Sequence, residues 1–166
     1  MAMRQCGTCT LCCKLMGIGA LDKPQGQWCA HCQPGKGCGI YLDRPQECRQ
    51  FNCLWLTDER LGEEWYPKKS RMVLTHEADR IVARVDPGTP DAWRKPPYFA
   101  ALNRMMQQDL AQGRLVYAAI NRHYILLLPD RQEDLGPLGE GDEVELATVS
   151  KPGGLEYRVT VRRGAQ

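Results

Sequence analysis

Residues 6–13 of the chain read CGTCTLCC, so four cysteines occupy eight consecutive positions and the last two are adjacent. The 166-residue chain has no cysteine after position 53. Its nine cysteines are Cys6, Cys9, Cys12, Cys13, Cys29, Cys32, Cys38, Cys48 and Cys53. A C-x-x-C pair lets two sulfur atoms converge on one metal ion, and further thiolates complete a tetrahedron. Three such pairs within one short segment, with three single cysteines after them, therefore predict metal binding through all nine thiolates.

The adjacent pair Cys12–Cys13 needs an explanation of its own. Neighbouring side chains point to opposite faces of an extended chain and diverge by about 100° on a helix. Adjacent cysteines are therefore poor ligands for one ion and good ligands for two neighbouring centres. If residues 6–13 are helical, Cys6, Cys9 and Cys13 share one face, and Cys12 is turned aside. We expect more than one metal ion, or a bridging thiolate.

The cysteine spacing leaves several arrangements open. Two zinc sites would use eight thiolates, one [4Fe–4S] cluster would use four, and a bridged cluster of three divalent ions could use nine. The start of the segment overlaps the ferredoxin run C-x2-C-x2-C-x3-C-P, but the next cysteine follows at once and no proline comes after it. Thiolates suit both metals, so the expected cofactor is zinc, in two or more ions, or iron, including an iron–sulfur cluster.

The charge of the chain bears on which partners it can bind. The formal charge of +2 assumes neutral thiols. Eight thiolates and two Zn²⁺ ions together contribute −4, which would change the formal charge to −2. Because basic residues are not interleaved with aromatic ones in a stripe, we do not expect nucleic-acid binding. Metal ions are the expected partners, and a protein partner stays an open alternative.

The expected compartment is the cytoplasm. No run of about 20 apolar residues is present, so we expect no membrane span. No signal peptide is recognisable after Arg4. A reducing cytosol disfavours disulfides, so dense cysteines there indicate metal or redox chemistry.

The expected fold class is α+β, with an irregular cysteine-rich module at residues 1–56 packed on a small body at residues 57–166. The two parts could also form one continuous domain. The module is rich in turns, and its only strong apolar cluster lies within residues 51–56. Bound metal would contribute to its folding free energy and so make up for the small core.

Hydrophobic periodicity predicts β-hairpins and one helix in the body. The helix begins at Tyr98 and ends before Gly113, with one apolar stripe at Phe99, Leu102, Met106 and Leu110. Residues 130–143 read as a loop. The expected strands pair as three hairpins, over residues 71–76 with 80–85, 115–120 with 124–129, and 143–149 with 155–161.

The N-terminal segment resembles a known family. CGTCTLCC (6–13), WCAHCQPGKGC (28–38) and IYLDRPQECRQFNCLW (40–55) are similar to the bacterial C-x-x-C-x-x-C-C cysteine-cluster proteins, which are zinc- or iron-chelating domain proteins. One member type is the flagellin lysine N-methylase. The resemblance covers about residues 6–56 and implies that these cysteines chelate zinc or iron. Cys32 looks like a subgroup feature, which makes it the weakest candidate ligand.

The expected function is metal binding with a structural, metal-handling or partner-docking role. Walker, G-x-G-x-x-G, G-x-S-x-G and H-E-x-x-H motifs are absent from the sequence. We assign no catalytic residue and expect no enzyme, and we read His31 as a solvated loop residue. Arg44 and Arg49 either support the thiolates or brace a turn. The alternatives are an iron–sulfur redox protein or enzyme accessory and, ranked last, a zinc-ribbon-like nucleic-acid binder.

Overall fold

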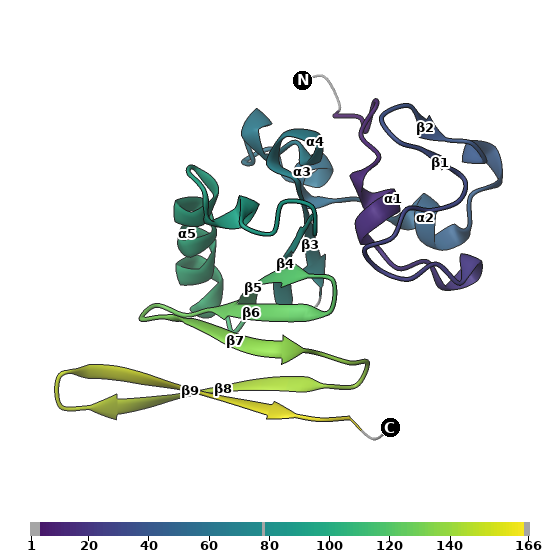
Figure 1. Cartoon of the computed structure of the whole chain (residues 1–166). Helices are drawn as coiled ribbons and strands as arrows, with labels where there is room; N and C mark the ends of the chain where they lie inside the picture. Colours follow the sequence, from purple (N-terminus) through teal and green to yellow (C-terminus); the bar gives the residue numbers. More distant parts are fainter. Residues whose placement is uncertain (1–3, 78, 165–166) are drawn as a thin grey trace.

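The fold is α+β, as predicted, and its strands form three separate sheets (Figure 1). It is described from a computed structural model that covers residues 4–77 and 79–164. The largest sheet is mixed and has the strand order β3-β4-β5-β6-β7. Two small sheets flank it in sequence, the ribbon β1-β2 in the cysteine-rich segment and the hairpin β8-β9 near the C-terminus.

The cysteine-rich segment consists of short elements joined by turns. They are α1 (Leu11–Leu15), η1 (Gly19–Leu21), β1 (Cys32–Gln33), β2 (Gly37–Cys38), η2 (Tyr41–Asp43), α2 (Gln46–Gln50) and α3 (Leu54–Thr57). The helix considered above for residues 6–13 does not form, because α1 begins only at Leu11 and Gly7 has a φ of 53°. Residues 46–55 do not form one continuous helix either. Phe51 and Cys53 are extended, and they separate α2 from α3.

The body begins with η3 (Glu63–Trp65) and α4 (Pro67–Ser70) and continues into the large sheet. β3 (Met72–Glu77) and β4 (Arg80–Val85) pair antiparallel, which confirms the first predicted hairpin. After η4 (Ala92–Arg94), the predicted helix is α5 (Tyr98–Leu110), and it crosses to β5 (Leu115–Ile120). β5 pairs parallel with β4, so one helical crossover joins the two predicted hairpins into a single sheet.

The far edge of this sheet includes a strand that the sequence did not indicate. β5 and β6 (His123–Leu127) form the second predicted hairpin. β7 (Gln132–Pro137) then pairs antiparallel with β6, so the loop prediction for residues 130–143 is wrong over this stretch. Its sequence, QEDLGP, lacks the β-branched and aromatic residues that are typical of strands, and only the pairing with β6 makes it extended.

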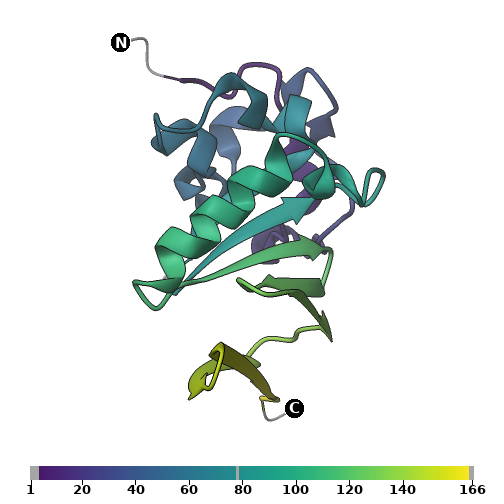
Figure 2. The ribbon, with the colours of Figure 1, turned by 90° about the vertical axis from the view of Figure 1, so that its left-hand side faces the viewer.

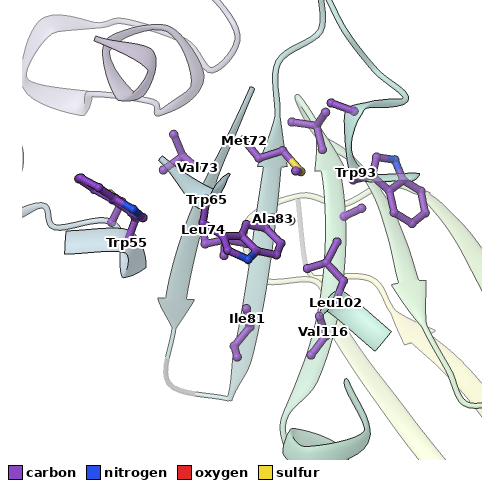
Figure 3. Packing of buried hydrophobic residues seen from close by; sticks show 14 of the residues in the cluster. Trp55, Trp65, Met72, Val73, Leu74, Ile81, Ala83, Trp93, Leu102 and Val116 are labelled. Atoms are coloured by element: carbon purple, nitrogen blue, oxygen red, sulfur yellow. The ribbon is translucent and has the colours of Figure 1, made fainter. Parts of the chain in front are cut away.

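One hydrophobic core joins the cysteine-rich segment to the sheet. Helix α5 lies across one face of the sheet and buries Leu102 and Met106 against it (Figure 2). The core includes Trp65, Met72, Val73, Leu74 and Trp93 from the body and Trp55 from α3 (Figure 3). Leu11 and Leu15 of α1 belong to the same cluster. The N-terminal helices therefore do not fold around a core of their own.

The third predicted hairpin, β8 (Glu143–Lys151) and β9 (Gly154–Arg162), packs some of its side chains against the opposite face of the sheet. Alternate residues of β5 face opposite sides: Val116 and Ala118 belong to the main core, whereas Tyr117 and Ala119 belong to a second cluster. The hairpin contributes Val144, Leu146, Tyr157 and Val159 to this second cluster. Over the residues that the structure describes, no helix is long and apolar enough to cross a bilayer.

Candidate metal centre

The nine cysteines come from three stretches of chain, residues 6–13, 29–38 and 48–53, that fold together at one end of the molecule (Figure 1). None of them forms a disulfide. The Cys29 amide donates a hydrogen bond of 3.0 Å to the Cys13 carbonyl, which joins the second stretch to the first. Cys32 and Cys38 face each other in the register of β1 and β2. The fold therefore brings distant cysteines into one region, which we call the cysteine cluster.

Cys6, Cys9 and Cys53 form the first thiol group. The Cys9 amide donates to the Cys6 carbonyl at 2.8 Å in a tight turn. Burial is the main cause that raises the pKa of the Cys53 thiol, and the charges of Cys6 and Cys9 add to it. The backbone amides of Leu56 and Trp55 oppose this increase, so the fold directs N–H groups toward the Cys53 sulfur.

The second thiol group, which surrounds Cys13, contains Cys29, Cys32, Cys38 and Cys48. Burial, followed by the charges of Cys13, Cys29 and Cys38, raises the pKa of Cys48. Burial and the charge of Cys13 raise the pKa of Cys32 to about 12. Cys48 and Cys53 therefore have different thiol neighbours, although only four residues separate them.

Cys12 and Cys13 interact directly despite their divergent directions on α1. A hydrogen bond with Cys12 is the main cause that raises the pKa of Cys13 far above its ordinary value, followed by burial. A hydrogen bond with Cys32 acts in the opposite direction. A thiol whose pKa is raised in this way is protonated at neutral pH, so a metal ion would have to displace its proton in order to bind.

The donor atoms fit a thiolate centre, but they do not converge on a single point. Across residues 4–77 and 79–164, no group of three or more His, Cys, Asp or Glu side chains could hold a metal ion as it stands. His31 is exposed, and the carboxylate of Glu47 accepts the amides of Gly19 and Ala20 at 3.0 and 3.2 Å. The donors within the cluster are therefore sulfur atoms, which suit zinc and iron.

The arginines near the cluster have different roles. Arg49 donates to the carbonyl oxygens of Arg44 and Leu42 at 2.8 and 2.6 Å, so it braces the turn before α2. Arg44 stacks on Tyr41, with 3.7 Å between its guanidinium carbon and the ring centroid. The charge of Arg44 also lowers the pKa of the Cys6 thiol, although burial raises that pKa more strongly.

Aromatic residues enclose one side of the cluster only. Trp55 is buried, and its ring lies 4.7 Å from that of Tyr66, centroid to centroid. The Tyr66 hydroxyl donates to the Cys6 carbonyl at 3.0 Å, so the body of the protein contacts the first thiol group. Trp28 and Tyr41 are 42% and 61% exposed, so they do not shield the cysteine cluster from solvent as Trp55 and Tyr66 do.

Sequence reasoning missed one residue of this region, Lys23. It is buried, and its ammonium group donates to the carbonyl oxygens of Lys14 and Met16 at the end of α1. Its sequence context, DKPQG, is typical of a solvated turn and gives no signal for a buried cation.

No protein-family model, no curated protein and no solved structure matches this chain. The resemblance of residues 6–56 to the C-x-x-C-x-x-C-C cysteine-cluster family therefore stays a prediction.

Proposed function

We propose that this protein binds zinc or iron through the thiolates of its cysteine cluster. The observation that carries the proposal is the meeting of three cysteine-bearing stretches. The first two are tied by the hydrogen bond from the Cys29 amide to the Cys13 carbonyl, and the charges of Cys13, Cys29 and Cys38 act on Cys48 in the third. Nine free thiols in one region are a soft donor set of the kind that holds zinc and iron–sulfur clusters. Because the thiols are neighbours without a finished coordination geometry, binding would draw them together and release their protons.

The two thiol groups favour more than one ion. Cys6, Cys9 and Cys53 neighbour one another, and Cys13 neighbours Cys32 and Cys48. The charge of Cys13 also raises the pKa values of Cys6 and Cys9, so Cys13 lies between the two groups. Cys12 and Cys13 are adjacent on α1, so they can each belong to a different centre or bridge two ions. All nine cysteines are therefore proposed ligands, and Cys32 keeps its place as the weakest.

The proposed role is structural, metal-handling or partner-docking, and the proposed location is the cytoplasm. A closed tetrathiolate site leaves no coordination position for a substrate, so we propose no catalytic residue. The cysteine-rich segment has few apolar side chains of its own, and bound metal would stabilise it. An iron–sulfur redox protein is the second candidate, because thiolates also hold such clusters.

The test is elemental analysis of the full chain purified without oxygen, together with its visible absorption spectrum. We expect two or more zinc or iron ions per chain. Iron with acid-labile sulfide and a brown colour would identify the iron–sulfur candidate, and a colourless protein with bound zinc would identify a zinc centre. A chain that contains neither metal and that takes up neither Zn²⁺ nor Fe²⁺ would overturn the proposal.

Single cysteine variants give a sharper comparison. Cys13→Ser should lower the metal content by at least one ion per chain, because Cys13 neighbours thiols from all three stretches. Cys32→Ser is the matched variant, with the same atomic change at the weakest candidate ligand, and should lower it least. Equal retention of metal by both variants would contradict the proposed ligand set.

A further inference from the structure

Lys23 is unusual because it is buried without an acidic partner. The residue is only 8% exposed, whereas lysine is almost never fully buried unless it is paired. Its ammonium group donates to the Lys14 carbonyl at 2.9 Å and to the Met16 carbonyl. Among residues 4–77 and 79–164, no carboxylate forms an ion pair with it, and its hydrogen-bond partners are the two uncharged carbonyls.

The backbone places this ammonium group beside the second thiol group. The Cys13 carbonyl accepts the Cys29 amide at 3.0 Å, and the very next carbonyl, of Lys14, accepts the Lys23 ammonium. Lys23 itself is held by two backbone hydrogen bonds with Ile18, of 2.9 and 3.1 Å. The ammonium group is therefore positioned by the same turn of helix that carries Cys12 and Cys13.

Electrostatics agree with this placement. Burial is the main cause that lowers the pKa of Lys23, and it is opposed by the charges of four thiols, those of Cys29, Cys13, Cys12 and Cys48. The interaction is mutual, because a thiolate that stabilises the ammonium ion is itself stabilised by it. A Zn²⁺ ion bound by four thiolates has a net charge of −2, and a buried cation can offset part of it.

We propose that Lys23 is the charge partner of the second thiol group, and that it tightens metal binding by stabilising the thiolate charge there. The inference rests on the proposed function, since the thiolates form when metal binds. An ammonium group has three N–H donors, and the two carbonyls take two of them. We expect the third to donate to a thiolate sulfur once metal binding has drawn the thiols together.

The test compares Lys23→Met with Lys23→Arg in the full chain. Methionine has a similar length and no charge, and arginine keeps the charge. Zn²⁺ affinity, measured by competition with a chromophoric chelator, should fall roughly 10- to 100-fold in Lys23→Met. Lys23→Arg should recover most of it. Lys36→Met is the matched control, because Lys36 lies between Cys32 and Cys38 in sequence but is exposed to solvent.

A second readout separates charge from structure. If Lys23 only holds the end of α1, Lys23→Met destabilises the chain but leaves the metal-bound thiolates chemically unchanged. If its charge acts on them, iodoacetamide should alkylate the zinc-loaded Lys23→Met variant several-fold faster than the zinc-loaded wild type. A Zn²⁺ affinity and an alkylation rate within twofold of wild type would overturn the role of Lys23 alone. A wild-type chain that binds no Zn²⁺ or iron overturns the proposed function and this role with it.

Discussion

Lys14 and Asp86 form an ion pair of 2.7 Å that joins the cysteine-rich segment to the large sheet. Lys14 directly follows Cys13 on α1, and Asp86 directly follows β4. The Asp86 side chain has no exposed surface, and its carboxylate also pairs with Arg71 and accepts the Gly88 amide at 2.9 Å. One buried carboxylate thus satisfies donors from both parts of the molecule.

Removing this charge should destabilise the whole fold. In Asp86→Asn, Lys14 and Arg71 lose their shared anion, so we expect the free energy of unfolding to fall by about 1–3 kcal/mol. Urea denaturation followed by circular dichroism measures the change. Asp130→Asn is the control, because the pair of Asp130 with Arg131 is solvent-exposed and should contribute less than about 1 kcal/mol. Equal stability of the two variants would contradict the anchoring role of Asp86.

Acid should release the C-terminal end of the hairpin through Asp142. The amides of Gly139 and Gly164, followed by Arg163, donate to its carboxylate and lower its pKa to about 2. The unfolded value is about 3.9, so the contribution to stability is complete above about pH 4 and is lost as the pH falls toward 2. NMR titration of the carboxyl carbon measures this pKa. A midpoint near 4 would contradict the hydrogen bonds from Gly139 and Gly164 to Asp142, and Asp142→Asn should make the Gly164 amide exchange faster at neutral pH.

The contact of α5 with the sheet should dominate the stability of the body. Leu102 has no exposed surface and lies in the main core (Figure 3). Leu102→Ala should lower the free energy of unfolding by about 2–5 kcal/mol, because it removes apolar contacts and leaves a cavity. Leu155→Ala makes the same change at a side chain that is 56% exposed, and should change it by less than about 0.5 kcal/mol. Similar losses in the two variants would show that α5 is not tightly packed.

Metal removal should loosen the cysteine cluster before the sheet. After chelation under reducing conditions, we expect faster hydrogen exchange at the amides of Cys29 and Cys32, which donate to the carbonyls of Cys13 and Cys29. The amides of Val82 and Tyr117 are the internal control, because both residues are buried at the centre of the large sheet. Unchanged exchange at all four amides would mean that bound metal does not support the segment.

Much of the body could be predicted from periodicity. Alternating and β-branched runs identified β3, β4, β5, β6, β8 and β9, and the stripe through Leu102 and Met106 identified α5. The parallel pairing of β4 with β5 could not be read in the same way, because it depends on a contact across the α5 crossover. β7 was missed because the pairing with β6, and not its own polar sequence, makes it a strand.

The candidate site was only partly visible in the sequence. The nine cysteines were identifiable from type and spacing, but their division into neighbours was not, since Cys53 meets Cys6 and Cys9 only after folding. A helix through residues 6–13 failed as an expectation because Gly7 is left-handed and α1 begins later. Lys23 was missed because burial depends on how residues 18–23 fold back on α1.

Within about one and a half turns, helix α1 contributes its two leucines to the main core and its two cysteines to the cysteine cluster. A rotation of this short helix would move both sets of side chains, so the proposed metal binding should be coupled to global unfolding. By mass action, the melting temperature should rise with the free concentration of the bound ion. Thermal unfolding of the large sheet should then report metal binding by the cysteines, even though no strand of that sheet carries a cysteine.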